Sequence, residues 1–212
     1  MADPERVTPP QGGAPDPLAE QVIESRLAWR GTFFEVQSEL VRCPDGHVGA
    51  REFIRHPGAV MVIALLPDGR ILLERQWRHP LRQSFIEMPA GKLAPGEDPL
   101  ACARRELLEE TGARSVRLLG RTGGWVAYRF PEGYRRSKAA RGWLGQKQIW
   151  FAFRFTGDES EFDLAGHHQV EFDRWRWADL DEALEGVAEF KRDTYREVIE
   201  TFRALIVGQQ TA

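Results

Sequence analysis

The chain has 212 residues, of which 42% are hydrophobic, and a formal net charge of −3 at pH 7. This length fits one folded domain with a small additional sheet. The slightly negative charge excludes a protein that holds long nucleic acid through a global basic field, so any contact with RNA must be local.

We expect no targeting signal in the N-terminal region. Residues 1–18 are rich in Pro, Gly and Asp, which predicts a disordered tail. They lack the basic start and apolar run of a signal peptide, and no later apolar stretch is long enough to span a bilayer. The two cysteines, Cys43 and Cys102, fit neither a disulfide framework nor a metal-binding spacing. We therefore expect a soluble, cytoplasmic protein with no membrane partner.

Residues 19–56 have the pattern of a small antiparallel β unit. The segment FFEVQSELVR, a CPDG turn and the return segment AREFIR predict a β-hairpin. We expect this unit to precede a second domain at residues 57–207, with residues 208–212 as a C-terminal tail.

The second domain mixes strands and helices. The apolar segments VMVIALL and ILLERQW flank the turn Pro67-Asp68-Gly69 and predict a buried hairpin. Three further strands and two helices are predicted downstream of a short strand near residues 85–88. The strands are expected at 116–119, 148–155 and 174–177, and the helices at 180–187 and 192–205. This alternation predicts an α/β fold.

A third helix is predicted at residues 98–111. Asp98 is a suitable N-cap, Pro99 suits the first turn, and Gly112 is a stop signal. Helical spacing gives this segment an apolar face and, next to it, an acidic face. The apolar face contains Leu100, Ala103 and Leu107, and the acidic face contains Glu106, Glu109 and Glu110.

The acidic face allows two interpretations. Like charges at this spacing repel by a few tenths of a kcal/mol per pair, roughly, so a bound cation would explain why they lie together. Mg²⁺ suits carboxylate oxygens best, and Mn²⁺ accepts similar ligands. The alternative is a solvated helix surface on which Arg104 and Arg105 relieve the repulsion.

The surrounding sequence favours the metal site. Residues Gly91 to Glu97 (GKLAPGE), seven further residues, and Arg105 to Ala113 (RELLEETGA) resemble a complete Nudix box. The resemblance implies an α/β/α sandwich with a mixed central sheet and a loop-helix-loop motif that presents the three glutamates to one or more Mg²⁺ ions. It also implies that Glu97 and Arg105 brace the loop and that Gly91 and Gly112 have structural roles. Ala113 departs from the box, where a larger aliphatic residue is usual.

The first half of the chain resembles ADP-ribose pyrophosphatases. The similar segments are WRGTFFEVQSELVR, HPGAVMVIALLPDGRILLERQWRHPL and EMPAGKLAPGEDP. This resemblance implies that the N-terminal β unit forms a homodimer and that Phe33, Phe34 and Arg78 lie near an adenine. The alternative places the two phenylalanines in the hairpin core and leaves Arg78 as a surface charge.

The second half instead resembles RNA pyrophosphohydrolases and dinucleoside polyphosphate hydrolases. The similar segments are GGWVAYRFP, GWLGQKQIWFAF, VEFDRWRW and EFKRDTYREV. This resemblance implies that five residues lie near the substrate and that Glu171 is a fourth metal ligand or the general base. The five are Tyr128, Gln146, Gln148, Phe190 and Lys191. Phe190 would stack on a base and Lys191 would contact phosphate, although each is also an ordinary core or surface residue type.

The two halves together predict a Mg²⁺-dependent Nudix pyrophosphohydrolase with a chimera-like sequence. Because residues outside the metal helix normally set substrate choice, we expect dinucleoside polyphosphates or the 5′-triphosphate ends of RNA as substrates. One alternative is an ADP-ribose pyrophosphatase. The other is a non-catalytic module that binds nucleotides without turnover, in which Glu106, Glu109 and Glu110 would have no catalytic use.

Overall fold

The computed structural model describes most of the chain. The described residues are 16–31, 35–79, 82–131, 145–164 and 172–207. The chain divides into two compact units. Unit 1 consists of residues 1–57 and 130–144, and unit 2 of residues 58–129 and 145–212.

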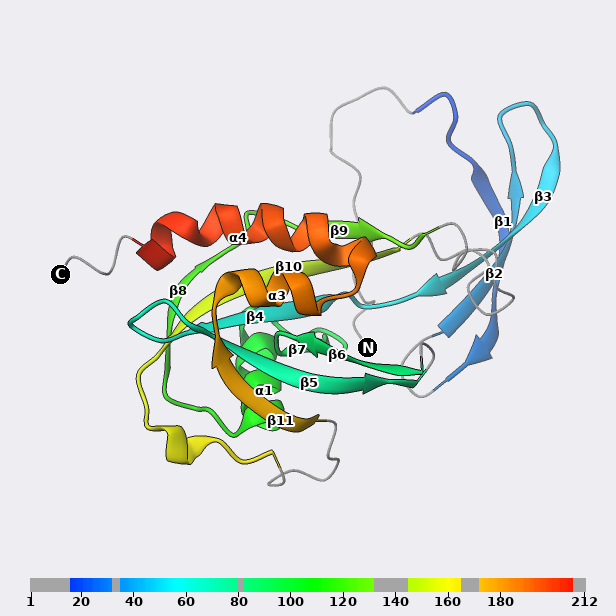
Figure 1. Ribbon diagram of the computed structural model, residues 1–212. Coiled ribbons are helices and arrows are strands. Elements are labelled where there is room, and N and C mark those ends of the chain that lie inside the picture. Colours follow the sequence, from blue (N-terminus) through cyan, green and yellow to red (C-terminus); the bar gives the residue numbers. More distant parts are fainter. Residues whose placement is uncertain (1–15, 32–34, 80–81, 132–144, 165–171, 208–212) are drawn as a thin grey trace. The chain divides into compact units, whose positions relative to one another are not determined.

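Unit 1 contains a three-stranded antiparallel sheet in the order β1-β2-β3 (Figure 1). The strands are β1 (Gln21–Arg30), β2 (Glu35–Arg42) and β3 (Val48–Arg55). Strands β2 and β3 pair without interruption, which confirms the predicted hairpin, and β1 adds a third strand that the sequence analysis had not separated. All ten residues of β1 are exposed.

Unit 2 contains an eight-stranded mixed sheet. Its main path runs β11-β5-β4-β10-β8, while β6 pairs with β5, β7 with β4 and β9 with β10. Strands β4 and β10 are parallel, and the other pairs are antiparallel. The strands are β4 (Ala59–Leu65), β5 (Ile71–Arg78), β6 (Gln83–Glu87), β7 (Ala90–Lys92), β8 (Val116–Arg121), β9 (Val126–Arg129), β10 (Gly145–Phe155) and β11 (Phe172–Ala178).

Helices cover both faces of this sheet (Figure 1). They are α1 (Pro99–Thr111), α3 (Leu180–Gly186) and α4 (Arg192–Val207), with short 3-10 helices η3 (Glu159–Glu161) and η4 (Glu189–Lys191). One buried apolar cluster joins the sheet to α3 and α4, and a second joins it to α1. The predicted α/β/α sandwich is therefore confirmed. Among the described residues, no helix is long and apolar enough to cross a membrane.

Strand β4 explains why the sheet needs a helix layer on each side. All seven of its residues are buried, since its alternate side chains enter the two apolar clusters. The predicted hairpin of β4 and β5 is present, but the two strands pair only at Leu65 and Ile71. Beyond that point β4 pairs with β7 and β10, and β5 with β6 and β11, so most of the pairing of both strands is with strands outside their own hairpin.

Helix α1 begins and ends where the sequence predicts. The Asp98 carboxylate accepts hydrogen bonds from the backbone N–H groups of Leu100 and Ala101, and Pro99 is the first helical residue. At the other end Gly112 has φ 81° and donates its N–H to the Leu108 carbonyl. The face that packs on the sheet includes the fully buried residues Cys102, Ala103 and Leu107. The acidic residues are thereby held on the remaining surface.

Candidate active site

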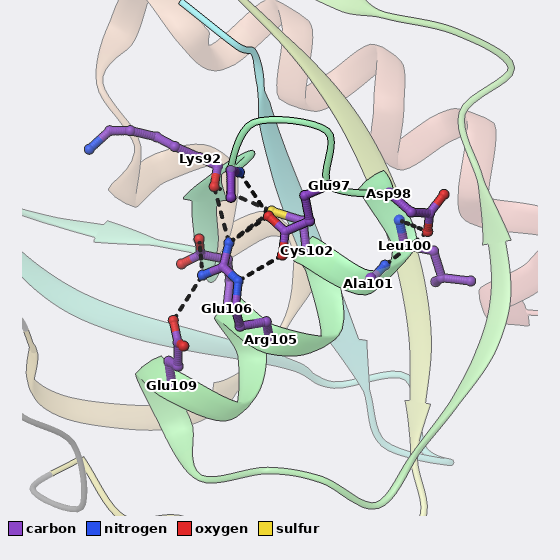
Figure 2. Close-up of polar contacts among 10 residues, drawn as sticks. Lys92, Glu97, Asp98, Leu100, Ala101, Cys102, Arg105, Glu106 and Glu109 are labelled. Carbon is purple, nitrogen blue, oxygen red and sulfur yellow. Dashed lines mark hydrogen bonds and ion pairs between the residues drawn. The ribbon is translucent and has the colours of Figure 1, made fainter. Parts of the chain in front are cut away.

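Arg105 lies at the centre of the polar contacts on α1 (Figure 2). Its Nε donates to Glu97 Oε1 at 2.8 Å, and its Nη2 donates to Glu97 Oε2 at 2.9 Å and to the Lys92 carbonyl at 3.1 Å. Its Nη1 lies 2.8 Å from Glu106 Oε1 and 2.9 Å from Glu109 Oε2. The hydrogen bond from Arg105 lowers the pKa of Glu97 to about 2. One guanidinium therefore ties the 93–97 loop to two of the candidate metal ligands.

Glu106 is held against the backbone of β7. A Cβ atom at Gly91 would lie 1.6 Å from the Glu106 carboxyl carbon, so only glycine allows this approach. Burial raises the pKa of Glu106, and the nearby Arg105 offsets that effect only in part. The charged carboxylate is therefore incompletely compensated by the protein, and a bound cation would stabilise it.

Glu110 points to a different partner from the other two glutamates. Its Oε2 accepts a hydrogen bond of 2.9 Å from the Ala90 N–H. In this arrangement no three His, Cys, Asp or Glu side chains of the described residues already converge on one metal position. The carboxylate chemistry of the three glutamates nevertheless fits a hard cation such as Mg²⁺. The Glu109 side chain is about half exposed, so an ion can reach it from solvent.

The end of α1 is fixed by a segment that the sequence analysis did not single out. The Glu161 carboxylate of η3 accepts hydrogen bonds from the N–H groups of Arg114 and Ser115, at 2.9 and 3.0 Å. The Asp163 N–H donates to the Thr111 carbonyl, which is at the last position of the helix. These contacts satisfy backbone groups at the helix exit and hold the turn that carries Glu109 and Glu110.

A second group of candidate residues gathers on the other face of the sheet. The rings of Tyr128 and Phe190 lie 5.7 Å apart, and Lys191 Nζ lies 5.7 Å from the Tyr128 ring centre. The Tyr128 hydroxyl donates to Gln146 Oε1, since β9 and β10 pair these two residues directly. Four of the five residues that the second-half resemblance implied thus form one contact group. We call Tyr128, Gln146, Phe190 and Lys191 the aromatic–lysine group.

Glu87 joins this group although the sequence analysis gave it no role. It is 4% exposed, and its Oε1 accepts from Lys191 Nζ at 2.8 Å while its Oε2 accepts from Arg78 Nε at 3.1 Å. Burial opposes ionisation, but Lys191 and Arg78 outweigh it, so the pKa of Glu87 is lowered. A signal existed in the sequence, because a carboxylate inside the apolar segment FIEMP must find partners when buried.

The remaining candidates divide into two sets. Gln148 is buried and follows Gln146 by two residues in β10, so both side chains lie on the same face of the strand. In the pairing of β10 with β9, Gln148 lies opposite Val126. Phe33, Phe34 and Glu171 lie outside the described residues. The tryptophans of the WRW segment, Trp175 and Trp177, are partly buried and pack against the α1-side apolar cluster.

The two groups of candidate residues are close in the chain. Glu87 ends β6, and Ala90, whose N–H binds Glu110, begins β7 three residues later. Three residues span at most about 10 Å even when fully extended. Residues 87–90 therefore connect the two groups of candidate residues by a short segment of chain.

The comparisons with known proteins identify similar chains. The family described as "NUDIX domain" matches residues 55–200. The RNA pyrophosphohydrolase of Caulobacter vibrioides is 48% identical over 155 residues, which cover 73% of this chain and 90% of the relative. The RNA pyrophosphohydrolase of Rhodospirillum rubrum is 43% identical over 150 residues, which cover 71% of this chain and 88% of the relative.

A solved structure shares the fold. It is described as an ADP compounds hydrolase, superposes with a TM-score of 0.57 at 17% identity, and the match covers 91% of this chain and 97% of that chain. Coverage of this extent includes part of unit 1 as well as unit 2. At this level of identity the match shows the fold alone.

Proposed function

The chain belongs to the Nudix family of pyrophosphohydrolases, and we propose that its substrates are 5′-polyphosphates, either dinucleoside polyphosphates or the triphosphate ends of RNA. The observation that carries this proposal is the aromatic–lysine group, in which two aromatic rings and a cation meet beside the β6–β7 segment. The names of the relatives from Caulobacter vibrioides and Rhodospirillum rubrum support the same substrate class.

In this proposal each member of the group has a distinct task. Phe190 is half-buried, so part of its ring is available to stack on a nucleobase, and the buried ring of Tyr128 supports it from behind. Lys191 and Arg78 contact phosphate oxygens. Gln146 fixes the orientation of Tyr128 by accepting its hydroxyl proton in a hydrogen bond.

We propose that Glu106, Glu109 and Glu110 hold a divalent cation, with Mg²⁺ as the natural ion and Mn²⁺ as a substitute. Such an ion neutralises pyrophosphate charge and lowers the pKa of a bound water. Arg105 and Glu97 keep the loop and helix in register for this task. Glu171, which lies outside the described residues, is our proposed fourth carboxylate, as a metal ligand or as the general base.

ADP-ribose is the second candidate substrate. The observation in its favour is the three-stranded sheet of unit 1, an element that the first-half resemblance predicted.

The same resemblance supports a homodimer through this sheet, which exposes several large apolar side chains, namely Val22, Ile23, Leu27 and Trp29. Sedimentation of the intact chain tests the dimer, and a species with the mass of one chain would refute it.

The scarcity of cysteine favours the cytoplasm as the proposed location.

The substrate proposal is tested by comparing kcat/KM for three compounds with Mg²⁺. The compounds are a triphosphorylated RNA oligonucleotide, diadenosine tetraphosphate and ADP-ribose. We expect one of the two polyphosphates to be cleaved fastest. Polyphosphate cleavage at background beside robust ADP-ribose cleavage would reverse the order, and tight binding of all three without turnover would favour a nucleotide-binding module.

A variant tests the role of the aromatic–lysine group directly. Phe190→Leu keeps an apolar side chain but removes the ring, so we expect KM for the preferred polyphosphate to rise about tenfold, because stacking on one base contributes roughly 1–3 kcal/mol. Phe162→Leu is the matched control, since Phe162 packs on Trp175 on the α1 side of the sheet. Equal effects of the two substitutions would contradict base stacking at Phe190.

A further inference from the structure

Glu87 occupies the position that an anion would take between the two proposed phosphate-binding cations. Lys191 comes from η4 and Arg78 from the end of β5, and both direct their charged groups at this one carboxylate. The Lys191 side chain is only 13% exposed and that of Glu87 is 5% exposed. The ion pair is therefore shielded from water. Dissolved salt screens its charges only weakly at this buried position.

The charges of Glu87, Lys191 and Arg78 partly compensate one another. Burial of a carboxylate opposes ionisation, but the two cations keep the pKa of Glu87 low, so the group is charged at neutral pH. A second buried carboxylate, Glu74, lies directly opposite Glu87 in the pairing of β5 with β6. Among the ion-paired groups, Glu87 carries one negative charge against the two positive charges of Arg78 and Lys191, so it offsets one of them.

A phosphate group that enters this site therefore encounters only a small excess of positive charge. Substrate and product of a pyrophosphohydrolase both carry phosphate groups, so two uncompensated cations would bind the products tightly as well as the substrate. An internal carboxylate repels an incoming anion in proportion to the charge of that anion. The repulsion is therefore largest for the most highly phosphorylated ligand.

We propose that Glu87 is a specificity-determining counter-ion, which holds Lys191 and Arg78 beside the rings of Tyr128 and Phe190 and limits how strongly they bind highly charged phosphate chains. This inference rests on the proposed function of the aromatic–lysine group as the substrate site. Glu87 acts through its two cations and is a positioning residue. The ligand class on which it acts is the nucleoside 5′-polyphosphate.

Binding without metal or turnover tests this role. Calorimetric titration in EDTA would compare inorganic tripolyphosphate with AMP, for the intact chain and for Glu87→Gln. We expect the Kd of tripolyphosphate to fall about tenfold in the variant, which corresponds to about 1.4 kcal/mol. The Kd of AMP should fall by less than about threefold, because the Coulomb energy scales with the charge of the ligand.

Two further variants separate charge at the site from charge in general. Glu200→Gln removes an equal charge from the exposed surface of α4, where Glu200 pairs with Arg203, and should leave both Kd values unchanged. Lys191→Met should weaken tripolyphosphate binding more than AMP binding. In the double variant with Glu87→Gln, the gain in tripolyphosphate affinity should be smaller than in the single variant, because one of the two cations is gone.

The outcomes separate this inference from the proposed function. Equal weakening of both ligands in a folded Glu87→Gln variant would make Glu87 a structural brace and overturn the inference, even if hydrolysis of polyphosphates is observed. Failure of the intact chain to bind tripolyphosphate would overturn it as well. If thermal melting shows that Glu87→Gln does not fold, a Lys191→Met variant that binds tripolyphosphate as well as the intact chain does would refute it. Selective tightening in Glu87→Gln would support it even if no substrate were cleaved.

Discussion

At the scale of single residues, the contact of Gly91 with Glu106 is the tightest constraint at the candidate site. The Gly91 Cα faces the Glu106 carboxylate so closely that a methyl group there would overlap it. No left-handed φ is involved at this position, so the requirement for glycine is purely one of space. A methyl group added at residue 91 would therefore displace the Glu106 side chain without straining the backbone at residue 91.

Gly91→Ala should thus damage both the fold and the site. We expect a loss of about 1–3 kcal/mol in the free energy of unfolding, the usual range for overpacking, together with a large fall in hydrolysis rate. Urea unfolding and a rate assay measure the two effects. Gly123→Ala is the matched control, because nothing lies within 4 Å of its added Cβ and its φ is not positive. Equal, small effects at both positions would show that Glu106 has room to move.

The residues of the Nudix box could be recognised in the sequence, whereas the residues that they contact in the fold could not all be predicted. The pattern predicted Glu97 and Arg105 as neighbours of the metal loop, but nothing local indicated that Arg105 would also contact Glu106 and Glu109. Glu87 and Glu161 were missed for a similar reason. Each acts on groups that are far away in the chain, Lys191 in one case and the exit of α1 in the other.

At the scale of elements, α1 was predictable because its signals are local. Its N-cap, its first-turn proline and its C-terminal glycine all lie within two residues of the observed ends. Strands β7 and β9 were not predicted, since they have only three and four residues. Their existence depends on pairing with β4 and β10, and no short stretch of sequence encodes such distant partners.

The C-terminal end of α1 gives a prediction at this scale. Gly112 and Gly96 both have positive φ, so alanine at either position costs roughly 1–2 kcal/mol of backbone strain. At Gly112 an added Cβ would also lie 2.4 Å from the Glu161 carbonyl oxygen, while at Gly96 it would meet nothing within 4 Å. Gly112→Ala should therefore destabilise the protein by at least about 1 kcal/mol more than Gly96→Ala. Equal losses in urea unfolding would mean that η3 does not hold the helix end.

At the scale of the whole molecule, most of the N-terminal sheet lies outside the region that matches the Nudix family. The relatives named RNA pyrophosphohydrolase align with 155 residues or fewer, and the Nudix family match covers 55–200. The three-stranded sheet of unit 1 precedes that region. Fold class and family were predictable because the box and the apolar strands are strong local patterns. Substrate choice was less predictable, because the side chains that we propose to set it, such as Glu87, make contacts that exist only in the folded sheet.

The most direct test of the central claim is the rate of pyrophosphate-bond hydrolysis with Mg²⁺ in the intact chain, in Glu109→Gln and in the control Glu200→Gln. Triphosphorylated RNA and diadenosine tetraphosphate serve as substrates. We predict cleavage by the intact chain and the control, and a loss of at least about a hundredfold in Glu109→Gln with the melting temperature preserved. A folded Glu109→Gln variant that cleaves as fast as the control would contradict this prediction, because Glu109 would then have no part in the reaction.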